Sequence, residues 1–356
     1  MANPGDEASL RDRVLRSAAI HFIAPLIFPM VAVADVARVA GVSTATVSRV
    51  LNGHPSVRGE TRARVESAMQ SLNYRVTVAA RSLRTAQTRM VLALVPDFSN
   101  PYYAEIVRGL GACAREHDYE LLLCDTGLSE ARERAVAQML TRHMYDGVVC
   151  MDPYTTQRMV SEEVRTLPWV ACSEFVPDEQ IPHVSIDHRL AAKDAVLYLL
   201  AKGHRRIGLV NSDERYLYAQ QRREGYRDAL REAGLQERLD YIQIVGGIDH
   251  PLGELAARRL LALEQRPTAL FAVADTLAVG AIKATLAAGL RVPDDLAVVG
   301  FDDVPLASIF EPSLTTVAQP RRELGEQAMR LLLRRIHGET PDSITLPHTL
   351  VARRSA

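Results

Sequence analysis

The sequence predicts an α/β protein in which two doubly wound parallel-sheet subdomains follow a small all-α head. Two observations predict this class. From Met90 onward, apolar runs of four to six residues alternate with helix-length stretches, the order that parallel sheets with crossover helices require. From Val31 to about Arg89, the pattern is instead one of short helices with almost no strand signal. The remainder, about 265 residues, is long for one sheet, so two α/β subdomains are expected.

Residues 17–34 form an apolar run that imitates a secretion signal. Arginines precede this run, and Ala32-Val33-Ala34 ends it like a cleavage site. Pro25 and Pro29 interrupt the run, which is also too short to span a bilayer as a helix. We therefore expect residues 1–30 to be a disordered extension of a cytoplasmic protein, with secretion as the alternative.

Three short helices are expected between residues 31 and 76. Asp35 to Ala40 has apolar residues at helical spacing, and the glycine that follows can adopt the left-handed turn that ends a helix. Ser43 is a good N-cap for a second helix from Ala45 to Asn52, and a third helix covers about Glu60 to Leu72. Two short helices joined by such a turn form a helix-turn-helix.

The second helix carries the side chains expected to contact DNA. With its apolar stripe buried, Thr44, Ala45 and Arg49 face outward, where a major groove would receive them. The Arg49 guanidinium can donate two hydrogen bonds to O6 and N7 of one guanine. The short polar side chains around them suit phosphate oxygens. These are Ser43, Thr46, Ser48 and Asn52.

The charge of the chain is divided unevenly. The whole chain has 42 basic and 43 acidic side chains, a net charge of -1. Residues 31–90 hold nine arginines against three acids, a net charge of +6, and residues 1–30 are balanced. Residues 91–356 therefore carry a net charge of -7. A basic head before an acidic body indicates that the head binds a polyanion.

These residues carry a resemblance to a known family. Asp35-Val36-Ala37 through Gly41-Val42-Ser43 to Ala45-Thr46-Val47-Ser48-Arg49-Val50-Leu51-Asn52-Gly53 closely resembles the N-terminal signature of the lactose-repressor/galactose-repressor family of bacterial transcription regulators. The likeness extends from Val31 to about Arg353. It implies a repressor that binds a near-palindromic operator in double-stranded DNA as a homodimer. It also implies a body like the type I periplasmic binding proteins, with a small effector in the cleft between two subdomains.

Residues 77–88 are expected to form a hinge helix and linker. The Ala-Arg-Ser-Leu-Arg run in this segment resembles the family's hinge helix, which orders on operator DNA and wedges a leucine into a minor-groove step. The resemblance assigns the wedge to Leu83 and a DNA contact to Arg81. Such a short segment is not a stable helix by itself, and an apolar wedge lets DNA bend. Val76 and Thr77 stand where the family often has Pro-Asn, which predicts a less rigid entry to the helix.

The body, residues 89–356, is expected to alternate strands and helices in order. The predicted strands are Val91–Val95, Glu120–Cys124, Gly147–Met151, Trp169–Cys172, Ile207–Val210, Tyr241–Val245, Ala269–Val273 and Leu296–Gly300. The predicted helices are Tyr103–His117, Ser129–Arg142, Arg189–Lys202, Gln220–Ala233, Gly253–Glu264 and Asp275–Ala288. One subdomain is expected to contain about residues 89–187 and 320–345. The other is expected to contain about residues 188–319 and 346–356.

Polar side chains follow most of the predicted strands. In open α/β sheets, ligands bind beyond the carboxyl ends of the strands. Several hydrogen-bond acceptors converging there suit a polyhydroxylated ligand, such as a sugar or a nucleoside. The residues at these strand ends are Asp97, Asp125, Asp152, Asn211, Asp213, Asp275, Asp302 and Asp303. Asn100, Tyr102 and Tyr103 follow the first strand, and the two rings can stack on a sugar or a base.

The resemblance narrows the candidates for effector binding. It places Asp302 at a strand end that contacts ligand, and Arg222 at an arginine that anchors an effector hydroxyl or carboxylate. It matches Asp275 to the acid of an Asn-Asp pair, although Ala274 replaces the Asn, and Asp187 to a cleft residue near the crossover between subdomains. The expected effector-binding residues are Asp97, Asn100, Tyr102, Tyr103, Asp187, Arg222, Asp275 and Asp302. The choice between sugar and nucleoside stays open, as does that between dimer and tetramer.

No catalytic motif accompanies these acids. The run from Gly109 to Ala114 matches G-x-G-x-x-A, but it lies inside a predicted helix, which excludes a dinucleotide site. The four cysteines are too far apart for a metal or redox pair and are expected to be small buried hydrophobes. No histidine spacing fits a metal site. We expect a DNA-binding repressor that is not an enzyme and has no cofactor, metal or membrane segment. A secreted solute-binding protein is the main alternative, and a sugar-modifying enzyme a weaker one.

Overall fold

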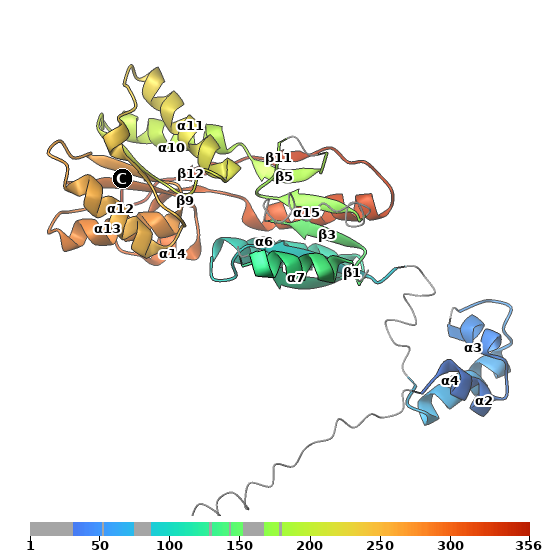
Figure 1. The fold of residues 1–356 in the computed structure, drawn as a ribbon. Helices are drawn as coiled ribbons and strands as arrows, with labels where there is room; N and C mark the ends of the chain where they lie inside the picture. Colours follow the sequence, from blue (N-terminus) through green and yellow to red (C-terminus); the bar gives the residue numbers. More distant parts are fainter. Residues whose placement is uncertain are drawn as a thin grey trace, which may run out of the picture. The chain divides into compact units, whose positions relative to one another are not determined.

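The chain divides into two compact units, Met1–Arg81 and Ser82–Ala356. The computed structural model describes residues 31–51, 53–74, 87–127, 130–141, 144–151, 167–177 and 180–356 (Figure 1). Three of the DNA-binding candidates lie outside the described residues, namely Asn52, Arg81 and Leu83. So do the extension of residues 1–30 and most of the predicted hinge helix.

The first unit contains the three helices that the sequence predicts. They are α2 (Val33–Ala40), α3 (Thr44–Leu51) and α4 (Gly59–Ser71). At the start of α2, the Asp35 carboxylate accepts a hydrogen bond from the backbone N–H of Ala32 (3.0 Å). The helix ends at Gly41, whose φ of 62° lies in the left-handed region that favours glycine. Ser43 begins α3 as predicted, because its Oγ accepts the N–H of Thr46 (3.1 Å).

The three helices share one small apolar core. Its buried residues are Val36, Ala37, Ala40, Val47, Val50, Val65, Ala68 and Tyr74. Because Val47 and Val50 face this core, the opposite side of α3 is left exposed. Arg64 on α4 donates from Nε to the carbonyl oxygen of Ala40 (3.2 Å) and from Nη2 to that of Gly41 (3.1 Å). The third helix therefore fixes the turn that orients α3.

The second unit contains two six-stranded sheets, and this confirms the doubly wound α/β class. Sheet A has the order β11 (Ile344–Leu346), β5 (His183–Ile186), β4 (Trp169–Cys172), β3 (Gly147–Cys150), β1 (Met90–Val95), β2 (Glu120–Asp125). Sheet B has the order β12 (Thr349–Val351), β10 (Thr315–Ala318), β9 (Ala297–Asp302), β8 (Ala269–Ala272), β6 (Ile207–Asn211), β7 (Ile242–Ile244). All neighbouring strands are parallel except β10 and β12, which are antiparallel.

Helices cover the faces of both sheets (Figure 1). They are α6 (Tyr102–Glu116), α7 (Glu130–Leu140), α10 (His188–Ala201), α11 (Leu217–Glu232), α12 (His250–Leu261), α13 (Asp275–Ala287), the short α14 (Pro305–Ile309) and α15 (Arg321–Ile336). A single 3-10 turn, Leu239–Tyr241, precedes β7. Helices α10 and α11 lie on one face of sheet B, and α12 and α13 lie on the other.

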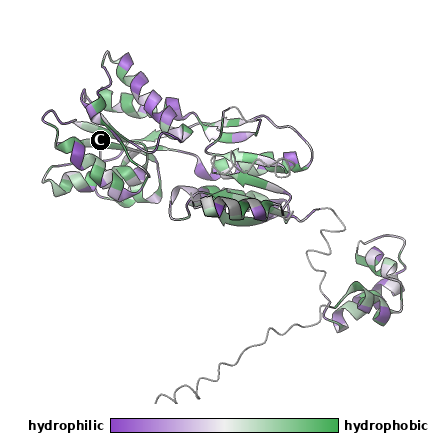
Figure 2. Cartoon of the chain, in the orientation of Figure 1, coloured by the Kyte–Doolittle hydropathy of each residue, from purple (hydrophilic) through white to green (hydrophobic). Residues whose placement is uncertain are grey.

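The strand β1 shows how the sequence produces this layering. Val91, Ala93 and Val95 belong to the core that includes α6, whereas Leu92 and Leu94 pack with residues of α7. Alternate side chains of a strand point to opposite faces, so a continuous apolar run is needed where both faces are covered. Figure 2 shows the strands of both sheets in the colour of hydrophobic residues, while the helices carry both colours.

The strands β5, β10, β11 and β12 and the helices α14 and α15 add to the predicted elements. All four of these strands lie at or next to a sheet edge and span only three or four residues, too short for a clear apolar period. The chain passes between the sheets after β5, after β10 and between β11 and β12. The two sheets are thus joined by three separate crossings.

Glycines allow pairs of helices to cross at backbone contact. A Cβ on Gly109 of α6 would lie 2.0 Å from the carbonyl oxygen of Arg322 in α15. A Cβ on Gly280 of α13 would lie 2.0 Å from the carbonyl oxygen of His250 in α12. Gly109 opens the G-x-G-x-x-A match, so its position inside α6 confirms that this run is not a strand-to-helix phosphate loop.

None of the four cysteines, all of which the structure describes, forms a disulfide. Cys113, Cys150 and Cys172 are buried as predicted, while Cys124 is partly exposed. Burial raises the pKa of the Cys172 thiol to about 12. Among the described residues, no helix has the combined length and apolar character needed to cross a bilayer.

Candidate functional site

Helix α3 presents three of the predicted DNA contacts on its outer face. Thr44, Ala45 and Arg49 are exposed, on the side opposite the buried Val47 and Val50. The remaining described candidates, Ser43, Thr46 and Ser48, lie at the start and flank of the helix.

Two of these candidates are already used in the local structure. The Ser43 Oγ caps α3, and it also lies 2.9 Å from the Thr46 Oγ1 in a second hydrogen bond. This pair stabilises the first turn of α3 and so supports the exposed residues beside it. Thr44, Ala45 and Arg49 are the exposed candidates that lie within α3 itself.

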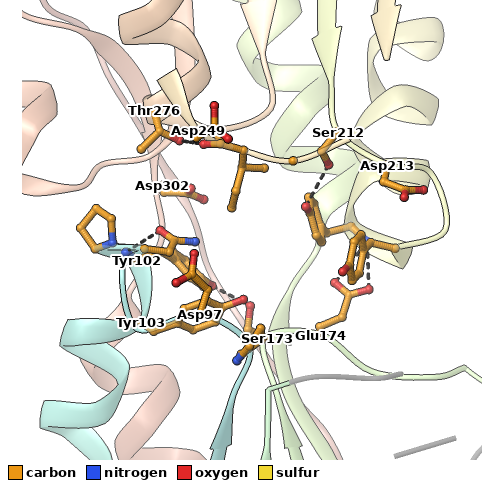
Figure 3. Close-up of a pocket in the computed structure, with 18 of the residues that line it drawn as sticks. Asp97, Tyr102, Tyr103, Ser173, Glu174, Ser212, Asp213, Asp249, Thr276 and Asp302 are labelled. Carbon is orange, nitrogen blue, oxygen red and sulfur yellow. Dashed lines mark hydrogen bonds between the residues drawn. The ribbon is translucent and has the colours of Figure 1, made fainter. Parts of the chain in front are cut away.

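A pocket of about 420 Å³ lies between the carboxyl ends of the two sheets (Figure 3). This volume is within the range of small-molecule sites. Segments after β1, β3 and β4 contribute from sheet A. Segments after β6, β7 and β8 and the end of β9 contribute from sheet B. The lining residues with polar or aromatic side chains are Asp97, Ser99, Asn100, Tyr102, Tyr103, Ser173, Glu174, Ser212, Asp213, Tyr216, Tyr218, Arg222, Asp249, His250, Thr276 and Asp302.

Six of the eight predicted effector-binding residues line this pocket, namely Asp97, Asn100, Tyr102, Tyr103, Arg222 and Asp302. Asp187 does not, because it is the N-cap of α10, where its exposed carboxylate accepts the N–H of Leu190 (2.8 Å). Asp275 does not either, because it is fully buried beneath the pocket. Both are structural carboxylates in this arrangement.

Arg222 occupies the floor of the pocket with its guanidinium nearly fully buried. It donates to the carbonyl oxygen of Val273, and its Nη2 lies 3.2 Å from Nδ1 of His188. A guanidinium has no acceptor, so Nδ1 of His188 must be the unprotonated nitrogen. Burial and the Arg222 charge hold the pKa of His188 well below its usual value, so this imidazole is neutral.

The charge of Arg222 is balanced by Asp302 and by an aromatic face. Its Nη2 lies 3.6 Å from Oδ1 of Asp302, and its Cζ lies 3.6 Å from the centroid of the Phe301 ring. Burial raises the pKa of Asp302 to about 6, although Arg222 and a hydrogen bond from Gln319 act in the opposite direction. The floor of the pocket is thus a buried pair of donor and acceptor groups rather than an isolated cation.

A chain of hydrogen bonds connects this pair to the other side of the pocket. Gln319 donates from Nε2 to Oδ1 of Asp302 (2.7 Å) and accepts at Oε1 from the Tyr102 hydroxyl (3.1 Å). The Tyr102 hydroxyl also lies 2.7 Å from the Ser173 Oγ. Tyr102 and Ser173 belong to the sheet A half and Asp302 to the sheet B half, so the chain links both halves through side chains.

Glu174 makes a second link between the halves. It follows β4 of sheet A, and its Oε1 accepts the N–H of Leu217 (2.6 Å) at the first turn of α11. Its carboxylate also lies 3.3 Å from the N–H of Tyr218. A carboxylate at a helix N-terminus is stabilised by the free N–H groups and the helix dipole.

Aromatic rings form the wall near α11. Tyr216 and Tyr218 are stacked, with centroids 5.6 Å apart and an interplanar angle of 23°. The Ser212 Oγ donates to the Tyr218 hydroxyl (2.9 Å), which fixes that ring. Tyr103 belongs to the sheet A half of the lining, as Figure 3 shows. Ring faces of this kind pack against the faces of a cyclic ligand.

Several lining residues were not among the predicted effector contacts. They are Ser173, Glu174, Ser212, Asp213, Tyr216, Tyr218, Asp249, His250 and Thr276. Asp213 was named by the strand-end rule but is absent from the narrower list that the resemblance gave, and Ser212 beside it could have been included by the same rule. Asp249 follows the short β7 by several residues, and its place in the lining depends on the loop that returns to α12. The path of that loop could not be predicted from the sequence.

The described residues include one grouping with metal-ligand atom types, which the spacing of histidines did not predict. Cys113, Glu116 and His117 at the end of α6 have ligand atoms within 4.8 Å of one another. The His117 Nδ1 lies 2.9 Å from the carbonyl oxygen of Cys113, a helix-end hydrogen bond that uses one ring nitrogen. Burial raises the pKa of the Cys113 thiol, which disfavours the thiolate that a metal needs.

Comparison with known proteins gives two family matches in different parts of the chain. The model described as bacterial regulatory proteins, lacI family, matches residues 32–76. The model described as a periplasmic binding protein-like domain matches residues 196–356. The first match covers the helix-turn-helix unit, and the second covers all six strands of sheet B and β11 of sheet A.

Relatives match over nearly the full length. Catabolite control protein A of Priestia megaterium is 37% identical, over 91% of this chain and 99% of its own. The HTH-type transcriptional repressor CytR of Escherichia coli K12 is 38% identical, over 86% of this chain and 89% of its own. A crystal structure of the lac repressor dimer bound to operator and an anti-inducer superimposes with a TM-score of 0.81 at 27% identity, over 91% of this chain and 98% of that one.

Proposed function

Because the chain belongs to the lacI family of bacterial regulatory proteins, we propose that it is a repressor that binds a near-palindromic operator as a dimer and responds to a small polar effector. The single observation that carries this proposal is helix α3. A capped helix with Thr44, Ala45 and Arg49 exposed, on a basic unit, has the chemistry and dimensions of a major-groove recognition helix.

Each segment of the chain has its own function in this proposal. Residues 31–76 bind DNA, residues 77–88 form the hinge, and residues 89–356 bind effector and form the dimer. The effector occupies the pocket between the sheets, where Arg222, Asp302 and the tyrosines are its contacts. Effector binding changes the geometry of the paired DNA-binding units, which couples the pocket to the operator.

The protein acts in the cytoplasm and binds its effector without turning it over. The relatives named above are transcription regulators, which supports a binding role for the pocket. The helix-turn-helix also argues against a secreted solute-binding protein, since such a protein has no use for a DNA-binding head.

Footprinting of the purified full chain on palindromic and scrambled DNA fragments tests the proposal. We expect protection of a symmetric site that weakens steeply as salt rises, because phosphate contacts release counterions. A repressor also requires that a palindromic fragment compete better than random DNA at moderate salt. Equal competition by both DNAs would contradict it.

A further inference from the structure

The pocket lining is rich in acids and poor in cations. Its carboxylates come from Asp97, Glu174, Asp213, Asp249 and Asp302. Among the lining residues in the described part of the chain, Arg222 supplies a guanidinium and no lysine is present. An incoming anion would therefore meet more negative than positive groups.

Arg222 is not available as a free cation for an anionic ligand. Its Nη1 is used by the carbonyl oxygen of Val273 and its other side by His188, and it lies 3.6 Å from the Asp302 carboxylate. The remaining N–H groups, together with Asp302, form a donor beside an acceptor. That combination matches a hydroxyl group, which both donates and accepts.

Two of the helix N-termini that flank the pocket, those of α11 and α12, are also occupied. Helix N-termini are common binding sites for phosphate, because their N–H groups are free. Here the Glu174 carboxylate accepts from the first residues of α11, with Oε1 2.6 Å from the N of Leu217. The Asp249 carboxylate accepts from the N–H of Leu252 (3.0 Å) in the first turn of α12. The chain's own acids thus stand where a ligand phosphate would bind.

The other acids likewise have partners within the protein. The Asp97 carboxylate accepts from the N–H and the Oγ of Ser99, at 2.7 and 2.8 Å. Asp213 pairs with the Arg215 guanidinium. Because each carboxylate already has a partner, the pocket offers no bare negative group for a cation either. Aromatic faces and hydroxyl groups complete the lining (Figure 3).

We infer that this pocket selects an uncharged, hydroxyl-rich ring compound and rejects its phosphorylated form, and that Glu174 and Asp249 impose this selection by filling two helix N-termini. The inference rests on the proposed function only in taking the pocket as the effector site. Glu174 and Asp249 act as specificity residues through repulsion of like charge.

Isothermal titration of the full chain with matched probes tests the inference. The probes are common pentoses, hexoses and nucleosides, each paired with its phosphate monoester, together with the amino sugar of each hexose. We expect at least one uncharged compound to bind, with its phosphate ester at least about 100-fold weaker, since placing like charges side by side is costly. The inference is overturned if an ester or an amino sugar binds as tightly as its uncharged partner. It is equally overturned if no uncharged probe binds.

Glu174→Gln isolates the proposed cause, because the amide keeps the shape and an acceptor oxygen but removes the charge. We expect the ratio of the affinities for the uncharged ligand and its phosphate ester to fall about tenfold, whatever the change in either affinity alone. Asp249→Asn makes the same change at the N-terminus of α12. It replaces Glu174→Gln as the test variant if Glu174→Gln has a lowered melting temperature. Glu264→Gln, an exposed acid outside the pocket, is the matched control and should leave the discrimination unchanged. Unchanged discrimination in both pocket variants would overturn the roles of Glu174 and Asp249.

The operator footprint of the unliganded protein separates this inference from the proposed function. Sequence-selective DNA binding with a preference for phosphorylated ligands would overturn the inference alone. Loss of sequence selectivity would overturn the proposed function without reference to ligand charge.

Discussion

Gly300 and Asp275 form a close pair below the pocket that explains one of the misplaced ligand candidates. A Cβ at Gly300 would lie 2.4 Å from Oδ1 of Asp275, so only glycine leaves room for that carboxylate. Asp275 accepts from the N–H of Val304 (2.8 Å) and from the Thr316 hydroxyl (2.5 Å). Burial, and secondarily the charge of Asp302, raises its pKa well above the ordinary range. Asp275 thereby holds the segment that follows β9, next to Asp302 at the end of that strand.

Asp302 should give the folded protein a characteristic pH dependence. Burial raises its pKa to about 6 from an ordinary 3.8, so the folded chain takes up a proton at a pH where the unfolded chain does not. Its contribution to the free energy of unfolding is therefore largest below about pH 4 and is lost as the pH rises through 6. Relative to Asp302→Asn, the wild type should gain on the order of 1 kcal/mol between pH 7 and pH 5.

Urea denaturation of both proteins at the two pH values measures this difference. Asp187→Asn, at the exposed cap of α10, is the control and should follow the wild type. If the free energies of unfolding of the wild type and Asp302→Asn differ by the same amount at pH 5 and pH 7, this carboxyl does not titrate in that interval.

Arg49→Ala should relax the sequence preference of DNA binding. If the guanidinium contacts one guanine through two hydrogen bonds, its loss costs about 1 to 3 kcal/mol at that base pair. Arg38→Ala removes the same charge from the same unit, where Arg38 is exposed and pairs with Asp35. We expect this control to weaken binding similarly for all sequences. Competition assays with single-base operator variants measure the sequence preference of each protein. An unchanged preference in Arg49→Ala would mean that Arg49 contacts phosphate instead of a base.

At the scale of elements, the contact between α12 and α13 depends on Gly280. Ala at this position would force its Cβ against the carbonyl oxygen of His250, which is backbone and cannot move alone. We expect Gly280→Ala to lower the free energy of unfolding of the second unit by about 1 to 3 kcal/mol, the usual cost of overpacking. Gly246→Ala is the control, since a Cβ there meets nothing within 4 Å. Thermal unfolding measures both, and equal melting temperatures would show that the helices separate at no cost.

The predictability of each element follows its length and burial. The helices α6, α10 and α13 and the strand β4 were predicted nearly to their ends, because caps and apolar runs mark them. The strand β10 has the sequence Thr-Thr-Val-Ala. It was not predicted, because two polar threonines interrupt the apolar run that would mark a buried strand. In α15, the arginines around the buried leucines obscure the helical period, so this helix was not predicted.

The pocket was predicted to the extent that strand ends define it. Asp97, Arg222 and Asp302 follow strands or match the family pattern, and all three line the pocket. Glu174 and Asp249 were not assigned to it, because their position depends on how the two sheets face each other. That arrangement is a property of tertiary packing, and no local pattern encodes it.

At the scale of the whole molecule, the edge of sheet A offers a surface for the proposed dimer. Leu123 on the edge strand β2 is 46% exposed, and it borders a groove that also includes Val107 and Ala112 of α6. Leu123→Asp should therefore weaken dimerisation at least about tenfold, because an unpaired charge would be buried in the interface. Sedimentation at several concentrations measures this, with exposed Leu239→Asp as the control. A variant that stays dimeric would place the interface elsewhere.

The net charge of -1 for the chain conceals its functional division. The basic head and the acidic body nearly cancel, so the total suggests no partner at all. Resolved by segment, the positive charge belongs to residues 31–90, which include α3, and five acids of the body line the pocket. Charge balance is therefore informative here only when it is taken unit by unit.

The three crossings between the sheets set an order for assembly during synthesis. Sheet A is closed by β11, which leaves the ribosome only after every helix and parallel strand of sheet B. At roughly 5–20 residues per second, β5 remains an open edge for on the order of ten seconds. An open edge is a template for pairing with other chains. The nascent protein is therefore most exposed to misassembly in the interval between the synthesis of β5 and that of β11.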